Sequence, residues 1–152
     1  MNNQWSKYRP LTKLDQLAET IMKTAFIMSE NHHVIQSYVE HKGANFRIIN
    51  RVGEQQYDIL CRQINIEKTN YAFISKKDHE QGLRGDLYIG LVIFIDGQKP
   101  TKYLIPSTVW NNPGQLFTDN SVKHPEYGIN LNSKTMKEFV ENYALETQIG
   151  LI

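Results

Sequence analysis

The residues with the clearest chemical potential lie in the stretch 46–62, FRIINRVGEQQYDILCR. Its two apolar runs carry Asp58 and two arginines, Arg47 and Arg62, and a polar turn separates the runs. Carboxylates bind metal ions, whereas guanidinium groups bind phosphate through paired N–H donors. Side chains two residues apart in a strand project from one face. The stretch therefore predicts a hairpin that presents groups of both kinds.

A helix is predicted near each end of the chain. Thr12 and Asp15 have the spacing of a capping box, so a first helix is expected to begin there and to end near residues 30–32. Ser133 is placed to cap a last helix. The two apolar stripes, repeating every three or four residues, are Leu14, Leu17, Ala18, Ile21, Ala25 and Met28, and Met136, Phe139, Val140 and Tyr143.

Between the helices, short apolar runs predict five or six strands. The most apolar run, DLYIGLVIFI at 86–95, has the profile of a central strand covered on both faces. Residues 111–130 are rich in Asn, Pro and Gly and predict a surface loop. The strand runs are 34–40, 46–50, 57–61, 70–74, 86–95 and 102–105. This order predicts an α/β (α+β) fold with a central mixed β-sheet flanked by helices.

Length and composition limit the class of protein. The 152 residues fit a single domain, 1–152, with residues 1–11 as a loosely held N-terminal arm. The net charge of +1 provides no global attraction for nucleic acid, so any such binding needs a local basic face. Cys61 is the one cysteine, and its apolar surroundings predict a buried, inert thiol. Without a signal-like N-terminus or a long apolar run, we expect a cytoplasmic protein with no membrane partner.

Four segments occur in an order that resembles the restriction-endonuclease-like, or PD-(D/E)XK, nuclease superfamily, in particular a bacterial branch of unassigned function. They are YAFISKKDHE at 71–80, DLYIGLVIFID at 86–96, YLIPSTVW at 103–110 and PEYGINLNSK at 125–134. The match covers residues 12–145. The resemblance implies a restriction-endonuclease-like core over this range. It also implies a site in which an aspartate and a second acceptor hold Mg²⁺ and a lysine assists the attacking water.

The resemblance breaks at the catalytic motif. The metal-binding aspartate of the family falls on Arg47, the Glu/Gln position falls on Leu60, and the lysine falls on Arg62. A guanidinium cannot bind a metal ion, and leucine has no donor atom. The alignment therefore predicts no metal site and no cofactor. We expect a non-catalytic protein that acts by binding nucleic acid or a protein partner.

Two alternatives stay open. An active Mg²⁺-dependent DNA endonuclease would use Glu19 of the first helix and Asp58 in a displaced arrangement, and only this reading requires Mg²⁺ as a cofactor. A protein-interaction subunit or homodimer without a nucleic-acid role is favoured by the near-neutral charge.

If nucleic acid is bound, the candidate residues are Arg47, Arg62, Lys76 and Lys77. The guanidinium groups match phosphate oxygens, and Lys42 lies near them in the sequence. An internal ion pair with Asp58 or Glu19 is an equally supported role for the arginines. A solvated pair is the simpler interpretation of the two lysines.

The remaining histidines and aromatic residues give weaker patterns. His32 and His33, with His41, invite a metal-site interpretation, but adjacent histidines at a helix end are expected to face solvent. Trp110 and Phe117 lie in regions without regular periodicity, where they are expected to cover an edge of the sheet.

Overall fold

The computed structural model describes residues 4–8, 12–36, 43–78 and 82–152. Its helices are α1 (Thr12–Ile27), α2 (Met136–Tyr143) and α3 (Leu145–Gln148), with 3-10 turns η1 (Trp5–Lys7), η2 (Lys76–Asp78), η3 (Ser107–Asn111) and η4 (Ile149–Leu151). Its strands are β1 (His32–Gln36), β2 (Phe46–Asn50), β3 (Gln56–Asn65), β4 (Tyr71–Ser75), β5 (Leu87–Phe94), β6 (Thr101–Pro106), β7 (Phe117–Asn120) and β8 (Glu126–Asn130). Within the described ranges, no helix combines the length and the apolar character needed to cross a membrane.

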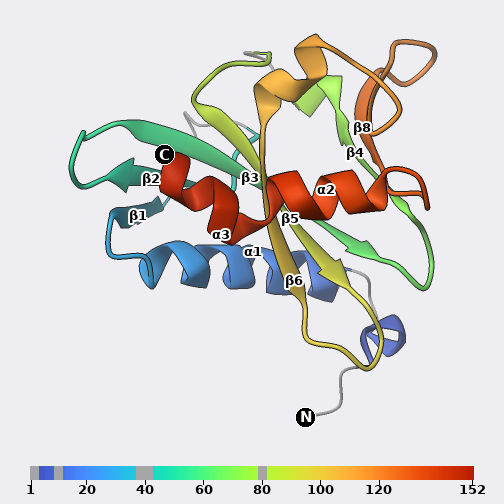
Figure 1. The fold of residues 1–152 in the computed structure, drawn as a ribbon, viewed down its shortest axis with the longest axis horizontal. Helices are drawn as coiled ribbons and strands as arrows, with labels where there is room; N and C mark the ends of the chain where they lie inside the picture. The colour runs from blue at the N-terminus through green and yellow to red at the C-terminus, as the bar shows by residue number, and fades with distance from the viewer. Residues whose placement is uncertain (1–3, 9–11, 37–42, 79–81) are drawn as a thin grey trace.

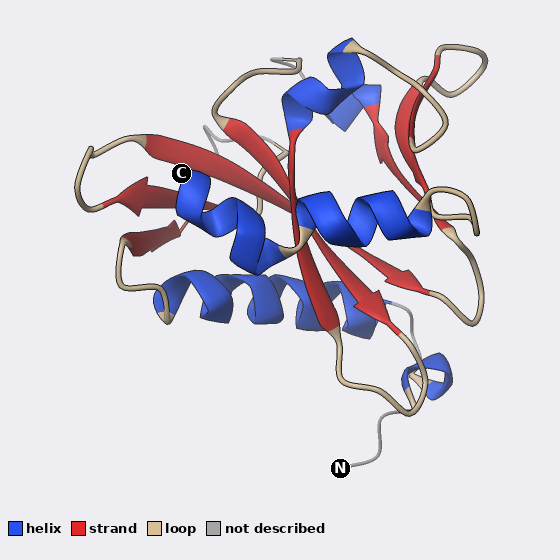
Figure 2. Ribbon diagram, in the orientation of Figure 1, coloured by secondary structure: helices blue, strands red, loops and turns tan. Residues whose placement is uncertain are grey.

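The main sheet has the strand order β1-β2-β3-β5-β6 (Figures 1 and 2). Strands β3 and β5 are parallel, and every other pair in this sheet is antiparallel. The sheet is therefore mixed, and the expected α/β fold with helices around a central mixed sheet is confirmed at this level.

A second sheet of three antiparallel strands, in the order β4-β8-β7, was not predicted. Two of its strands come from residues 111–130, so the prediction of a surface loop there is wrong. Each of the two strands buries few apolar residues, among them Phe117 in β7 and Ile129 in β8. The alternation of apolar and polar residues in these two strands is weak, and the Asn and Gly content of the segment is more typical of a loop.

Apolar residues pack on both faces of the main sheet. On one face, α1 contributes Ala18 and Phe26 to a cluster that includes Val92 of β5. On the other face, Leu91 of β5 belongs to a cluster with Phe139 of α2. Strand β5 is therefore covered on both sides, as the sequence predicted for a central strand.

The two helical stripes differ in detail from the predictions. Helix α1 ends at Ile27, and Met28, which was predicted to be buried, is 77% exposed beyond the helix. Helix α2 buries Phe139 but leaves Val140 41% exposed, because an eight-residue helix presents only a narrow face to the sheet. Ser133 makes no cap; Asn132 Oδ1 accepts the N–H groups of residues 134 and 135 instead.

Residues 4–8 pack against the sheet and are not loosely held, in contrast to the prediction for the arm. The Trp5 ring is buried, with its centroid 5.0 Å from that of Phe94, and Trp5 Nε1 donates a hydrogen bond of 3.0 Å to Gln98 O. Ser6 donates hydrogen bonds to the Asp96 carboxylate from its hydroxyl and its main-chain N–H, and these bonds lower the pKa of Asp96.

Gly90 of β5 lies where α1 packs closely on the sheet. A Cβ at this position would be 2.8 Å from Met22 Cε, and Met22 is fully buried. We expect Gly90→Ala to lower the free energy of unfolding by about 1–2 kcal/mol, because overpacking would displace the methionine. Urea denaturation measures the loss. Adding Met22→Ala should make the combined loss smaller than the sum of the single losses, and simple additivity would contradict this explanation.

Candidate functional site

Asp58 lies in the middle of the main sheet. The register of the β2–β3 hairpin places it directly opposite Arg47, and on its other side it lies beside Leu87 of the parallel strand β5. Its main-chain N–H donates a hydrogen bond of 2.7 Å to Asp86 O. Both neighbouring strands therefore fix the backbone that carries this carboxylate.

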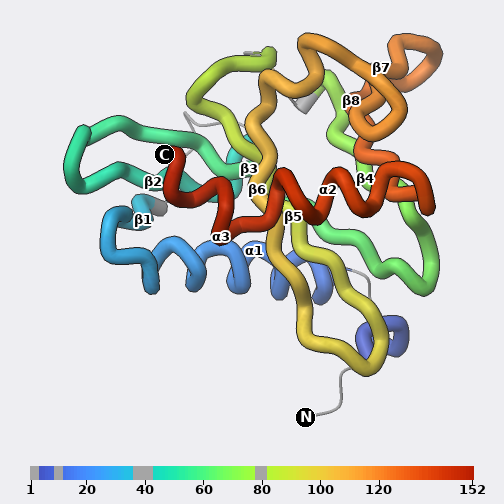
Figure 3. Tube along the Cα trace, in the orientation of Figure 1, coloured from blue at the N-terminus to red at the C-terminus, as the bar shows by residue number. Residues whose placement is uncertain are grey.

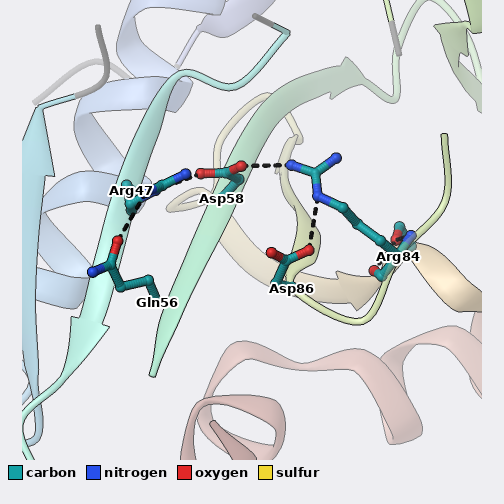
Figure 4. Close-up of polar contacts among 6 residues, drawn as sticks. Arg47, Gln56, Asp58, Arg84 and Asp86 are labelled. Carbon is teal, nitrogen blue, oxygen red and sulfur yellow. Dashed lines mark hydrogen bonds and ion pairs between the residues drawn. The ribbon is translucent and has the colours of Figure 1, made fainter. Parts of the chain in front are cut away.

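The Asp58 carboxylate is held between two guanidinium groups (Figure 4). Arg47 Nε lies 2.9 Å from Asp58 Oδ1, and Arg84 Nη2 lies 2.5 Å from Asp58 Oδ2. The network continues outward on both sides, because Arg47 Nη1 donates to Gln56 Oε1 at 2.8 Å and Arg84 Nε pairs with Asp86 Oδ1 at 2.7 Å. Two positive and two negative charges balance within it.

Arg84 was not among the residues predicted from the sequence. It lies in the connection before β5 and is fixed there by the fully buried Ser107. The Arg84 main-chain N–H donates to Ser107 Oγ at 3.1 Å, and this hydroxyl donates to Arg84 O at 2.7 Å. Since Arg84 and Asp58 are 26 positions apart, no local pattern could have revealed their contact.

The electrostatics of this network favour a structural role. The Asp58 side chain is only 6% exposed, and each arginine side chain is 25% exposed. A largely desolvated carboxylate needs nearby positive charge, and two charge-assisted hydrogen bonds provide it. Each oxygen already accepts from a cation, so this donor set does not fit a divalent metal ion. Among the described residues there is also no group of three or more His, Cys, Asp or Glu side chains that could hold one.

Glu19, the other candidate of the endonuclease alternative, is not brought to Asp58. It accepts a hydrogen bond of 2.7 Å from Asn45 Nδ2 and lies 3.8 Å from Lys23 on the same helix. Neighbouring residues of β3 point to opposite faces of the sheet. Ile59 packs in the α1 cluster and Leu60 in the α2 cluster, so Asp58 projects away from α1. The sheet separates the two carboxylates.

Cys61 is buried in β3, as predicted, and its main-chain N–H donates to Asn45 Oδ1 at 2.7 Å. Burial, assisted by the nearby Glu19, raises the pKa of the thiol to about 12.

We therefore expect Cys61 to resist alkylation in the native protein. Because the ordinary pKa of the thiol is 9.0, a value of about 12 lowers the thiolate fraction at pH 8 about 1,000-fold. The rate of modification by iodoacetamide, measured by mass spectrometry, should rise sharply when the protein is unfolded in urea. Equal rates in the native and unfolded states would contradict the burial of this thiol.

The other candidate cations lie around β4 and not beside Asp58. Arg62 Nη1 donates to Cys61 O at 2.9 Å and Arg62 Nε approaches Phe73 O at 3.4 Å. Lys76 Nζ pairs with Asp119 at 2.5 Å and lies 4.8 Å from the centre of the Tyr127 ring.

Lys77 is exposed in η2. Arg47 therefore belongs to the Asp58 network, Arg62 lies between β3 and β4, and Lys76 is held by the second sheet. Lys42, the neighbour considered in the prediction, lies outside the described residues.

The two adjacent histidines begin β1 and do not end a helix. His33 is exposed as predicted, but His32 is buried, so the prediction that it faces solvent is wrong. Its Nδ1 is 2.7 Å from Ser29 Oγ and its Nε2 is 2.8 Å from the main-chain oxygen of Ile152. Both ring nitrogens thus have protein partners. His41 lies outside the described residues.

Comparison with protein-family models, with curated protein sequences and with solved structures returned no match.

Proposed function

We propose that this protein is a restriction-endonuclease-like protein that does not cleave nucleic acid and acts by binding it. Three features support the family assignment alongside the sequence resemblance. A helix precedes the strands, a β2–β3 hairpin occupies the expected stretch, and helices flank a mixed sheet. Fold alone does not determine activity, and the residues at the position of the family's catalytic motif decide whether cleavage is possible.

The observation that carries the proposal is the placement of Asp58 between Arg47 and Arg84. A metal-dependent nuclease needs carboxylate oxygens free to bind a cation beside the scissile phosphate. Here both oxygens accept hydrogen bonds from guanidinium groups. A Mg²⁺ ion would have to displace these two cations and would then lie beside their positive charges. The two guanidinium groups that hold Asp58 in a structural role therefore also oppose metal-dependent cleavage.

A specific observation favours protein binding as a second candidate function. Phe73 lies on β4, at the edge of the second sheet, and is 52% exposed. Edge strands with exposed apolar side chains pair with other chains, including second copies of the same protein. This candidate predicts association that depends little on salt, whereas nucleic-acid binding weakens steeply as salt rises.

Two measurements test the proposal together. Fluorescence anisotropy with labelled single-stranded and duplex oligonucleotides should show binding that weakens as the salt concentration rises. A plasmid-nicking assay with Mg²⁺ or Mn²⁺ should show no cleavage by the wild type. The variant Asp58→Asn and its matched control Asp86→Asn, at the exposed end of the same network, should behave alike in that assay. Metal-dependent cleavage by the wild type would contradict the proposal, and its loss in an Asp58→Asn variant that circular dichroism shows to be folded would establish the endonuclease alternative.

A further inference from the structure

We propose that the outer face of the β4-β8-β7 sheet is a binding site for single-stranded nucleic acid. This inference rests on the proposed function and assigns it a surface other than the former catalytic position. Figure 3 shows these three strands together at one side of the molecule. Ala72, Ile74 and Ile129 face the core, and alternation along the strands therefore turns Tyr71 and Phe73 to the outer face.

Two aromatic rings form the centre of this face. Tyr71 lies across Gly128 of the neighbouring strand, where a Cβ would overlap its ring, and its hydroxyl donates to the Glu126 carboxylate. Burial and this hydrogen bond raise the pKa of Tyr71 from its ordinary value of 10.0 to about 12, so the hydroxyl remains a donor even in alkaline solution. Phe73 is stacked on Tyr71 with ring centroids 6.3 Å apart and an interplanar angle of 21°. Tyr71 is thus fixed, and the half-exposed Phe73 offers a ring on which a base can stack.

Two hollows lie along this sheet, and one of them includes the aromatic pair. One has a volume of about 530 Å³ and is lined by Gln115, Thr118, Asn130, Asn132, Ser133 and Lys134. The other has a volume of about 320 Å³ and includes Arg62 and Gln63 beside the two rings. Carboxamides and hydroxyls both donate and accept hydrogen bonds, which suits the edges of unpaired bases.

Exposed lysines occur in each of four segments that bound the sheet. Lys68 precedes β4, Lys77 follows it, Lys123 lies between β7 and β8, and Lys134 follows β8. Such cations bind the phosphates of a strand that crosses the face.

Two of the acidic groups near these lysines are already engaged within the protein. Glu126 accepts from Tyr71, and Asp119 pairs with Lys76. Glu67 is exposed beside Lys68 and remains on this surface. Glu138 is also exposed and lines a hollow with Lys134. The rim therefore carries charges of both signs, and stacking of bases on Phe73 is the main source of affinity, with phosphates bound by individual lysines.

The chemistry favours a single strand over a duplex. In a duplex the faces of the bases are already stacked on one another, so no base face is free to stack on an exposed phenyl ring. In a single strand every base has a free face.

The test uses fluorescein-labelled oligothymidylate and oligouridylate of about twelve nucleotides, with a duplex of the same length for comparison. We expect the full chain to bind the single strands more tightly than the duplex. Phe73→Ala should weaken binding about tenfold, because one stacked base is lost. Phe73→Trp should retain it. Lys134→Ala should reduce the slope of log affinity against log salt by about 0.7. Lys99→Ala is the matched charge control, because Lys99 is exposed in the β5–β6 connection, away from the second sheet (Figure 1).

The possible failures are distinguishable. If single strands bind but Phe73→Ala has no more effect than Lys99→Ala, this site is wrong and the proposed function stands. If neither single strands nor duplex bind below about 100 µM at low salt, both are wrong. Self-association that resists salt and disappears in Phe73→Ala, followed by sedimentation velocity, would assign this face to a second copy of the chain and overturn the inference.

Discussion

Replacing Asp58 with asparagine is expected to lower the free energy of unfolding by about 3 kcal/mol, since removing one partner of a buried ion pair leaves the other charge uncompensated. The side chain of Asp58 is almost fully buried, and the substitution keeps its shape while removing its charge. Arg47 and Arg84 would then face each other across a neutral amide. Urea denaturation of wild type and variant at neutral pH measures the change.

Whether Asp58→Asn lowers or raises the free energy of unfolding distinguishes a structural role of Asp58 from a catalytic one. A carboxylate retained for chemistry often costs stability, so its replacement leaves stability unchanged or raises it. Replacing a carboxylate that neutralises two arginines lowers the free energy of unfolding. Asp86→Asn is the control, because the Asp86 side chain is 56% exposed and its pair with Arg84 should contribute less than about 1 kcal/mol. Equal effects of the two substitutions would contradict the structural role of Asp58.

Trp110→Ala is expected to have an even larger effect, a loss of about 4 kcal/mol, because a large buried ring would leave a cavity. Trp110 lies in η3 and joins the two sheets. Its Nε1 donates a hydrogen bond of 3.0 Å to Gly128 O, and its ring packs against Phe117 at 5.3 Å and Tyr127 at 5.7 Å. Alanine would therefore also leave a buried carbonyl without its donor.

Trp110→Phe provides a graded control. It keeps most of the ring but removes the hydrogen bond, so its loss should be well below that of alanine. Denaturation followed by near-ultraviolet circular dichroism measures both variants. A loss below about 1 kcal/mol for Trp110→Ala would contradict the view that Trp110 holds the second sheet on the core.

The fold was predictable where one segment carried its own signal. The run at 86–95 predicted a central strand because it is apolar at successive positions, and β5 is buried on both faces. The capping spacing at Thr12 predicted α1. In contrast, β7 pairs with β8, and β8 pairs with the distant strand β4. The contact between β4 and β8 joins segments about 50 residues apart and leaves little trace in local composition.

The candidate site was predictable only in part. The sequence offered an internal pair between Arg47 and Asp58 as one alternative, and the hairpin register places the two residues opposite each other. Arg84 and Ser107 could not be found in this way, because both lie in connections that meet only in the folded chain. The sequence did not indicate an aromatic surface at Tyr71 and Phe73. Tyr71 lies across Gly128, and Gly128 belongs to β8, a strand that was not predicted.

The double clamp on Asp58 also has an evolutionary consequence. A mutation that removed Arg47 alone would leave Arg84 in contact with the carboxylate, and the reverse loss would leave Arg47 there. Replacing one arginine alone therefore does not free the Asp58 carboxylate for a metal ion, and each such replacement lowers stability. A metal site at Asp58 would therefore have to evolve through an intermediate that has lost one arginine and some stability but still holds the carboxylate with the other arginine.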